Sequence, residues 1–250
     1  MHFMKLVLED GTELRGRSFG APREVAGEVV FTTGMSGYVE TLTDPSFRGQ
    51  ILVTTYPLQG NYGVPARRPA GSIDAPFESG RVQVQGVVCL RHSERPSHHG
   101  MASTLGEWLR EENVPAVEGI DTRTLTRKLR EHGTMKGWLL RDDTPTAEGK
   151  LRADAIDMPT VVAQCTVAEA VTYAGGELRV LLVDTGCKDN IARAMVKRGA
   201  TVIRVPSHAD LAKYLPEVDG VLLSNGPGDP KDLMPLAEQI RGLFDKGIPT

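Results

Sequence analysis

The residues best suited to binding or catalysis lie in the segment Ser224–Pro230, which reads Ser-Asn-Gly-Pro-Gly-Asp-Pro. The apolar run Val221–Leu223 precedes it and predicts a buried strand, so the Gly-Pro-Gly corner would present backbone amides at the strand's end. An isolated Gly-Pro-Gly is more often a simple tight turn. A dinucleotide site is disfavoured, because the third glycine of its fingerprint would fall on Lys231. The sequence also has no Gly-x-x-x-x-Gly-Lys-Ser/Thr loop, so any ATP chemistry would belong to a partner.

The remaining candidate groups are three cysteines and a histidine pair. Cys89, Cys165 and Cys187 are widely spaced and form no Cys-x-x-Cys pair, which argues against a disulfide scaffold and a structural zinc site. Adjacent histidines such as His98 and His99 rarely point at one ion, and no third ligand is evident, so a solvated loop is expected. The sequence therefore predicts no metal site.

The composition is that of a globular protein with a sizeable core. The 250 residues are 40% hydrophobic and 24% charged, which suits one or two domains. The net charge of -3 and the pI near 6.1 provide no basic field for nucleic acid or an acidic membrane surface. Small metabolites or another protein are the expected partners. The N-terminus lacks a signal-peptide pattern and no apolar run is long enough for a membrane span, so a cytoplasmic location is expected.

The first half of the chain is patterned as short strands separated by Gly, Pro and Asp turns. Two helices are expected among them. Thr104 and Glu107 form a capping box at the start of one, and Asp121 caps the other, Thr122–Glu131. This half predicts an α+β domain with a largely β core. The expected strands are Lys5–Glu9, Glu28–Thr32, Gln50–Tyr56 and Gln85–Leu90.

From Glu177 onward, strands and helix-like segments alternate. The expected strands are nearly continuous apolar runs, as strands buried on both faces must be, and this predicts an incomplete doubly wound parallel α/β sheet. Ligands bind beyond the carboxyl ends of such strands, where Asp184–Asn190 and Ser224–Pro230 fall. Both loops are therefore predicted to face one site. The strands are Leu178–Val183, Thr201–Val205 and Gly220–Leu223.

The two halves together predict an α/β protein with two domains. The first domain is expected at residues 1–140 and the second at 177–250. Between them, at 141–176, the periodicity weakens and turn residues accumulate, so this stretch is interpreted as a linker region.

Several segments resemble one enzyme family, in that family's order along the chain. Leu223–Pro230 resembles the oxyanion-strand loop of class I glutamine amidotransferases, and Val183–Ile191 resembles the opening strand-turn-helix of one subfamily. Residues 27–46 (GEVVFTTGMSGYVETLTDPS), 55–63 (TYPLQGNYG) and 119–127 (GIDTRTLTR) resemble the N-terminal domain of the small, glutamine-hydrolysing subunits of carbamoyl phosphate synthetase. The glutamine loop alone would also suit anthranilate or GMP synthetase, which the first half of the chain disfavours.

This resemblance implies which residues bind the substrate. In the family, a serine of the Thr-Asp-Pro-Ser segment and the two glycines of the Gly-Pro-Gly loop hold glutamine; here these are Ser46, Gly226 and Gly228. No catalytic residue is expected in the chain, because the family's nucleophilic Cys, its His and its Glu would follow Thr250. Cys187 occupies a variable position of the Asp-x-Gly-x-Lys motif and has no elbow around it, so it is not expected to be the nucleophile.

The implied activity is that of the glutaminase subunit of a ligase. It would hydrolyse L-glutamine to glutamate through a thioester and supply ammonia to a large subunit, which makes carbamoyl phosphate from bicarbonate and ATP for arginine and pyrimidine synthesis. No cofactor is expected in this chain, whereas ATP and Mg²⁺ are expected on the large subunit. The 250-residue chain alone is expected to be inactive. The alternative is a non-catalytic docking or regulatory module for the large subunit.

Overall fold

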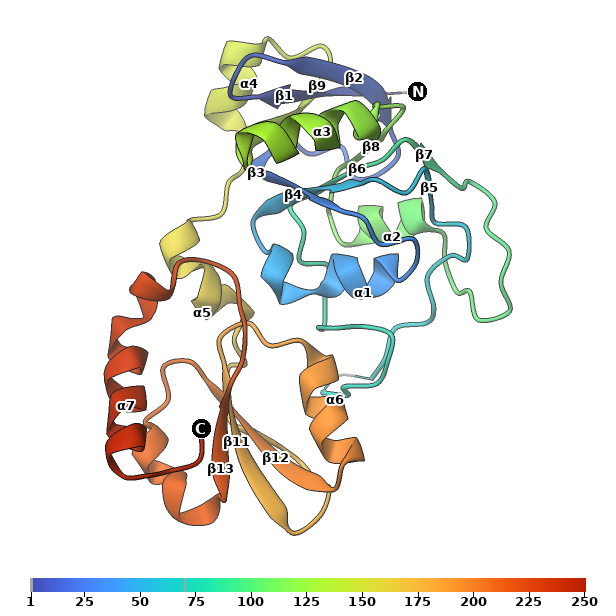
Figure 1. The fold of residues 1–250 in the computed structure, drawn as a ribbon. Coiled ribbons are helices and arrows are strands. Elements are labelled where there is room, and N and C mark those ends of the chain that lie inside the picture. Colours follow the sequence, from blue (N-terminus) through green and yellow to red (C-terminus); the bar gives the residue numbers. More distant parts are fainter. Residues whose placement is uncertain (1, 70) are drawn as a thin grey trace. The chain divides into compact units, whose positions relative to one another are not determined.

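A computed structural model describes residues 2–69 and 71–250, and the chain divides into two compact units (Figure 1). Unit 1 contains the described residues up to 69 together with Gly80–Ile156. Unit 2 contains Gly71–Ser79 and Asp157–Thr250. None of the described helices is both long and apolar enough to cross a membrane.

Unit 1 is built around a closed barrel whose strands follow the order β1-β2-β8-β6-β4-β3-β9. The pairs β3–β4, β4–β6 and β6–β8 are parallel, and the remaining pairs of the barrel are antiparallel. The sequence indicated a largely β core, but it did not indicate that the sheet closes on itself. The strands are β1 (Phe3–Leu8), β2 (Glu13–Ser18), β3 (Val25–Thr32), β4 (Gln50–Thr54), β6 (Gly86–Val88), β8 (Ala116–Glu118) and β9 (Met135–Arg141), with a separate pair of β5 (Leu58–Gln59) and β7 (Arg91–His92).

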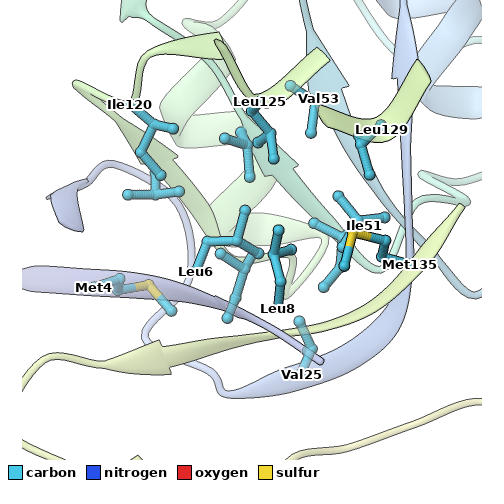
Figure 2. Packing of buried hydrophobic residues seen from close by; sticks show 14 residues of the cluster. Met4, Leu6, Leu8, Val25, Ile51, Val53, Ile120, Leu125, Leu129 and Met135 are labelled. Carbon is cyan, nitrogen blue, oxygen red and sulfur yellow. The ribbon is translucent and has the colours of Figure 1, made fainter. Parts of the chain in front are cut away.

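The barrel core is formed by alternate strand residues and by one helix (Figure 2). Met4, Leu6 and Leu8 of β1 share the inner face because successive strand side chains alternate. Leu125 and Leu129 of α3 (Thr122–His132) meet them, since residues four apart lie on one side of a helix. Each of these leucines is at most 3% exposed, and burying such a side chain contributes roughly 1.5–3 kcal/mol to folding.

The predicted caps are confirmed at both helices of the first half. The backbone N–H of Glu107 donates to Thr104 Oγ1 at 3.2 Å and that of Thr104 donates to Glu107 Oε2 at 2.9 Å, which begins α2 (Leu105–Glu111). The carboxylate of Asp121 accepts from the N–H of Thr124 at 3.0 Å, which begins α3. The other short helices of unit 1 are α1 (Tyr38–Thr43), η1 (Pro45–Phe47) and α4 (Thr146–Arg152).

Unit 2 contains a four-stranded sheet in the order β10-β12-β11-β13. Strands β11 (Leu178–Asp184), β12 (Ala200–Pro206) and β13 (Gly220–Leu223) are parallel, as predicted, and β10 (Val171–Tyr173) adds an antiparallel edge that the sequence did not indicate. One apolar cluster on the sheet includes side chains of α7 (Met234–Asp245) and another includes side chains of α6 (Asp189–Lys197). The sheet is therefore covered on both faces, as in a doubly wound fold.

The connections in unit 2 differ from the expected alternation. A helix was expected after the second parallel strand, Ala200–Pro206, but two 3-10 turns of three residues each follow it. The second turn carries a proline in its first turn. The stretch 141–176, interpreted above as a linker, holds α4, η2 (Met158–Thr160), α5 (Val161–Cys165) and β10, and the division between units falls after Ile156. The 3-10 turns after β12 are η3 (Leu211–Lys213) and η4 (Leu215–Glu217), and η5 (Pro230–Leu233) precedes α7.

Residues Gly71–Ser79 belong to unit 2 because one arginine of α6 holds them. Arg193 Nη1 donates to the carbonyl oxygens of Ile73 and Phe77 at 2.6 and 2.8 Å, and its Nη2 lies 3.0 Å from Glu78 Oε1. These contacts lie between residues more than 100 positions apart in sequence, so no local pattern announces them.

Candidate functional site: the carboxyl edge of the unit 2 sheet

The two loops predicted to form a site begin side by side. Strands β11 and β13 are paired in parallel up to Val183 and Leu223, so their following residues leave the same edge of the sheet. The backbone N–H of Thr185 donates to Ser224 Oγ at 3.0 Å, and Thr185 Oγ1 donates to the Ser224 carbonyl oxygen at 2.9 Å. The first loop thus fixes the start of the second.

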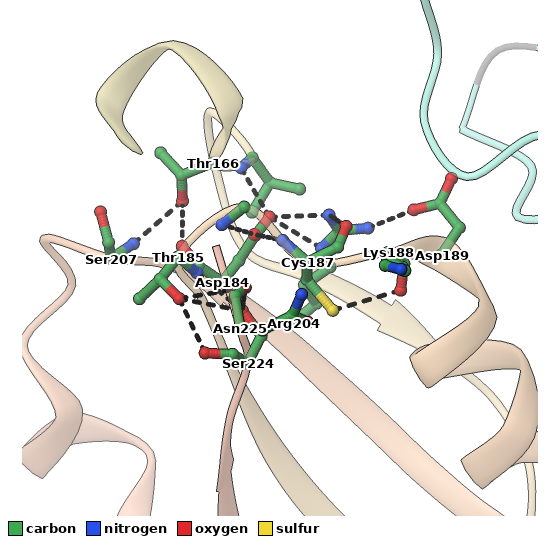
Figure 3. Close-up of polar contacts among 12 residues, drawn as sticks. Thr166, Asp184, Thr185, Cys187, Lys188, Asp189, Arg204, Ser207, Ser224 and Asn225 are labelled. Atoms are coloured by element: carbon green, nitrogen blue, oxygen red, sulfur yellow. Dashed lines mark hydrogen bonds and ion pairs between the residues drawn. The ribbon is translucent and has the colours of Figure 1, made fainter. Parts of the chain in front are cut away.

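Asp184 organises the first loop from a fully buried position (Figure 3). Its Oδ1 accepts from the backbone N–H groups of Gly186 and Cys187 at 2.9 and 2.7 Å, and its Oδ2 accepts from that of Val167 at 2.9 Å. Thr166 donates from its hydroxyl to the Asp184 carbonyl oxygen at 2.6 Å. The Asp184 carboxylate therefore fixes the turn that follows it and ties that turn to Val167.

Arg204 of β12 supplies the positive charge that balances this carboxylate. Its Nε lies 2.8 Å from Asp184 Oδ2, and its Nη1 lies 2.6 Å from Asp189 Oδ1, while its Nη2 donates to the Cys187 carbonyl oxygen at 3.0 Å. Burial opposes the charge on the guanidinium, but the two carboxylates outweigh burial and raise the pKa of Arg204. All three charged side chains are at most 6% exposed, so Arg204 joins two buried carboxylates into one network beneath the loop.

The second loop needs glycine at both positions that the sequence singled out. A Cβ on Gly226 would overlap the carbonyl oxygen of Thr185. Gly228 has φ +85°, and a Cβ there would lie 2.8 Å from Val161 Cγ1. Gly186 in the facing loop has φ +110°, and a Cβ on it would meet Pro227 Cδ at 2.5 Å. The two loops are therefore packed backbone against backbone.

The Gly-Pro-Gly loop presents unpaired donors at the edge of a hollow. Gly226 and Gly228 are exposed, and their backbone N–H groups donate to no other residue that the structure describes. The loop lines a hollow of about 380 Å³, which is also lined by apolar side chains, including Leu236 and Ile240 of α7. Two amides without an internal partner, on a loop that lines a hollow, are suited to donate hydrogen bonds to an oxygen atom of a ligand.

Ser46 lies in unit 1, in the 3-10 turn Pro45–Phe47. Its side chain is half-buried, and its backbone N–H donates to Asp44 Oδ1 at 2.9 Å, which fixes the turn. The sequence predicted this serine as a glutamine ligand through resemblance, and that role remains a prediction.

The cysteines of the chain differ in exposure. Cys187 is buried; burial raises its pKa to about 12, and its Sγ donates to the Lys188 carbonyl oxygen at 3.3 Å. Burial also raises the pKa of Cys89 far above the ordinary value. Both thiols are therefore protonated at neutral pH and poorly placed for attack. Cys165 is half-buried.

No metal centre emerges from the part of the chain that the structure describes. In residues 2–69 and 71–250, no three His, Cys, Asp or Glu side chains gather as ligands would. His98 and His99 lie with ring centroids 4.2 Å apart, and His98 Nδ1 accepts from the backbone N–H of Gly100 at 3.1 Å.

Sequence reasoning located both loops but missed Arg204 and Thr166, which hold them in place. The available signal was the charge of Arg204 itself. An arginine inside an otherwise apolar strand is rarely buried unless a carboxylate pairs with it, and Asp184 ends the neighbouring strand.

The edge of unit 2 lies within a region that matches a known family. Residues 181–250 match the family model described as glutamine amidotransferase class-I, and both loops fall within that match. Residues 6–139 match the model described as carbamoyl-phosphate synthase small chain, CPSase domain. This chain belongs to the carbamoyl-phosphate synthase small chain family.

The relatives extend this result to nearly the whole chain. The carbamoyl phosphate synthase small chain of Methanopyrus kandleri is 42% identical over 247 residues, covering 96% of this chain and 66% of that protein. That of Pyrococcus furiosus is 40% identical over 251 residues, covering 98% and 67%. The carbamoyl-phosphate synthase (ammonia), mitochondrial, of Aquarana catesbeiana is 41% identical over 250 residues, covering 98% and 16%. The chain thus spans about two-thirds of the small chains and as little as 11% of longer relatives.

Proposed function

We propose that unit 2 binds L-glutamine at the Gly-Pro-Gly loop, and that the protein is the glutaminase chain of a carbamoyl phosphate synthase. One observation carries the proposal: Gly226 and Gly228 are exposed, and their N–H groups have no partner among the described residues, on a loop fixed by the facing loop. In the proposal these amides donate to the side-chain oxygen of glutamine. That oxygen becomes negative when the amide carbon is attacked, and one preorganised donor lowers such a barrier by about 3 kcal/mol.

The network beneath the loop supports this role. A donor stabilises a developing charge best when it does not have to reorganise as the reaction proceeds. The contacts of Asp184 and Thr185 hold the loop before any ligand arrives, so the geometry of the amides is set in advance. The proposal assigns to Ser46 of unit 1 a hydroxyl contact to the same glutamine.

The wider reaction follows from the family. In the proposal, ammonia released from glutamine passes to a large chain that carries ATP and Mg²⁺ and makes carbamoyl phosphate from bicarbonate, in the cytoplasm, for arginine and pyrimidine synthesis. Neither buried cysteine of this chain is placed to attack an amide. We expect these 250 residues to bind glutamine without hydrolysing it by themselves.

A second candidate is a non-catalytic module that docks on the large chain. It is favoured by the relative from Aquarana catesbeiana, whose name specifies ammonia although it is 41% identical over 98% of this chain. Overall similarity therefore does not separate a glutamine-binding member from one that works on ammonia. A measurement of glutamine binding distinguishes the glutaminase chain from the non-catalytic module.

The test is binding of radiolabelled L-glutamine by equilibrium dialysis, with glutamate release, which we expect to be absent, measured in parallel. We expect saturable binding that is lost in Gly226→Ala and weakened in Ser46→Ala. Ser97→Ala, at an exposed serine of unit 1, is the control and should bind as the unmodified protein does. Absence of saturable binding by the unmodified protein, with intact association with the large chain, would favour the non-catalytic module.

A further inference from the structure

Unit 1 contains a second hollow with an excess of positive charge. It has a volume of about 830 Å³ and lies among residues of β1, β2, β7 and β8. Four arginines and only two glutamates line it, although the chain as a whole has a net charge of -3. The arginines are Arg15, Arg17, Arg91 and Arg95, and we call this place the arginine hollow.

Glu118 fixes one wall of the arginine hollow. Its Oε1 accepts from Arg17 Nε at 2.6 Å, and its Oε2 accepts from the backbone N–H of His92 at 2.9 Å and lies 2.7 Å from His92 Nδ1. The His92 ring stacks on Phe19 with centroids 4.1 Å apart. Gly16 lets the strands approach here, since a Cβ on it would overlap the Glu118 carbonyl oxygen. This wall is thus formed before any ligand binds.

Arg91 and Arg95 are the groups left to contact a ligand. Arg17 already donates hydrogen bonds to two carboxylates, those of Glu118 and Glu94. The distance from Arg17 Nη2 to Glu94 Oε1 is 2.6 Å. Arg15 forms an ion pair at the surface. Arg91 and Arg95 are exposed, and their guanidinium groups form no hydrogen bond or ion pair with any residue from 2–69 or 71–250. Arg15 and Arg17 are therefore paired with carboxylates, whereas Arg91 and Arg95 are available to a ligand.

We propose that the arginine hollow binds a soluble multivalent anion, an organic or inorganic compound with two or more carboxylate or phosphate groups, through Arg91 and Arg95. A planar guanidinium holds either group with two parallel hydrogen bonds. The apolar side chains of Phe3 and Leu90 also line the hollow, with 53% and 37% of their surfaces exposed. They provide contact area for the carbon skeleton of an organic anion. The site is independent of the glutamine loop in unit 2.

Calorimetric titration of the 250-residue protein with pyrophosphate and with citrate tests the proposal. The variant is the double substitution Arg91→Ala with Arg95→Ala. Its control is Arg123→Ala with Arg127→Ala, which removes the same charge from exposed positions of α3 in the same unit. We expect the first variant to weaken binding at least about tenfold, because it removes both charge-assisted contacts, and the control to change it less than about twofold.

The two anions also distinguish the ligand class. Tighter binding of pyrophosphate assigns phosphate groups and tighter binding of citrate assigns carboxylates, and either result supports the site when only the Arg91 and Arg95 variant loses it. Equal losses in both double variants would mean that binding follows net charge, and would overturn the proposal. Failure of the unmodified protein to bind either anion at low ionic strength would overturn it as well. All four positions are exposed, so circular dichroism should show unchanged folding.

Discussion

The substitution Arg204→Met directly tests the buried network of unit 2. It removes a guanidinium whose side chain is 6% exposed and which contacts Asp184, Asp189 and the Cys187 carbonyl oxygen. Methionine keeps much of the apolar stem, so the main cost is that two carboxylates stay buried without their cation. Removing one partner of a buried ion pair costs about 3–5 kcal/mol. We expect the free energy of unfolding of unit 2 to fall by that amount.

The assay separates the two units because the chain's two tryptophans, Trp108 and Trp138, both lie in unit 1. Tryptophan fluorescence therefore follows unit 1 during urea unfolding, and far-UV circular dichroism follows both units. With a urea dependence of about 2 kcal/mol per M, the expected loss lowers the midpoint of unit 2 by about 2 M. The fluorescence midpoint should stay in place.

Arg179→Met is the matched control for this substitution. Arg179 lies on the neighbouring strand β11, and its ion pair with Glu217 is 3.4 Å long between side chains that are 42% and 66% exposed. An exposed pair of this kind contributes about 0–1 kcal/mol. If Arg204→Met costs no more than Arg179→Met, the network does not support the unit and the reasoning above fails.

Three further predictions address the loops, the thiols and the barrel surface. Gly226→Ala should destabilise unit 2 by about 1–3 kcal/mol through overlap with Thr185, whereas Gly242→Ala, in open space on α7, should stabilise it by up to about 1 kcal/mol; urea midpoints decide. Because burial raises the pKa of Cys187 to about 12, and that of Cys89 further, iodoacetamide at pH 8 should label Cys165 first in the native protein, and mass spectrometry checks this. The hydrogen bond from Lys128 lowers the pKa of Asp10 to about 2, so the contribution of Asp10 to stability is complete above pH 4 and is lost as the pH falls toward 2. The midpoint difference between Asp10→Asn and the unmodified protein should shrink over that range, and a constant difference would contradict the assignment.

The features predicted correctly from sequence are those that neighbouring residues determine. The capping box at Thr104 and the cap at Asp121 depend on residues three positions apart, and both are confirmed. The three parallel strands of unit 2 were recognised by their nearly continuous apolar runs, although Leu222 of β13 is exposed. The shared edge of the two loops followed from the rule that parallel strands end on the same side.

The features that sequence missed depend on contacts between distant residues. Closure of the barrel requires β1 to pair with β9, and Met4 and Arg141 are more than 130 positions apart. The assignment of Gly71–Ser79 to unit 2 depends on the contacts of Arg193. A short edge strand such as β10 has too few residues to show a period. These features follow from the fold as a whole and have no local signature.

The position of Arg204 connects stability with function in unit 2. A loop that presents unpaired amides gains nothing in stability from them, so its shape must be held by other groups. Thr185 holds the Gly-Pro-Gly loop directly, and Asp184 and Arg204 hold the loop that contains Thr185. If the amides of Gly226 serve glutamine, a partial loss of this network should weaken glutamine binding before unit 2 unfolds. The substitution Arg204→Lys keeps the charge and loses the planar fork of the guanidinium. Its loss of binding free energy for glutamine should then exceed its loss in the free energy of unfolding of unit 2.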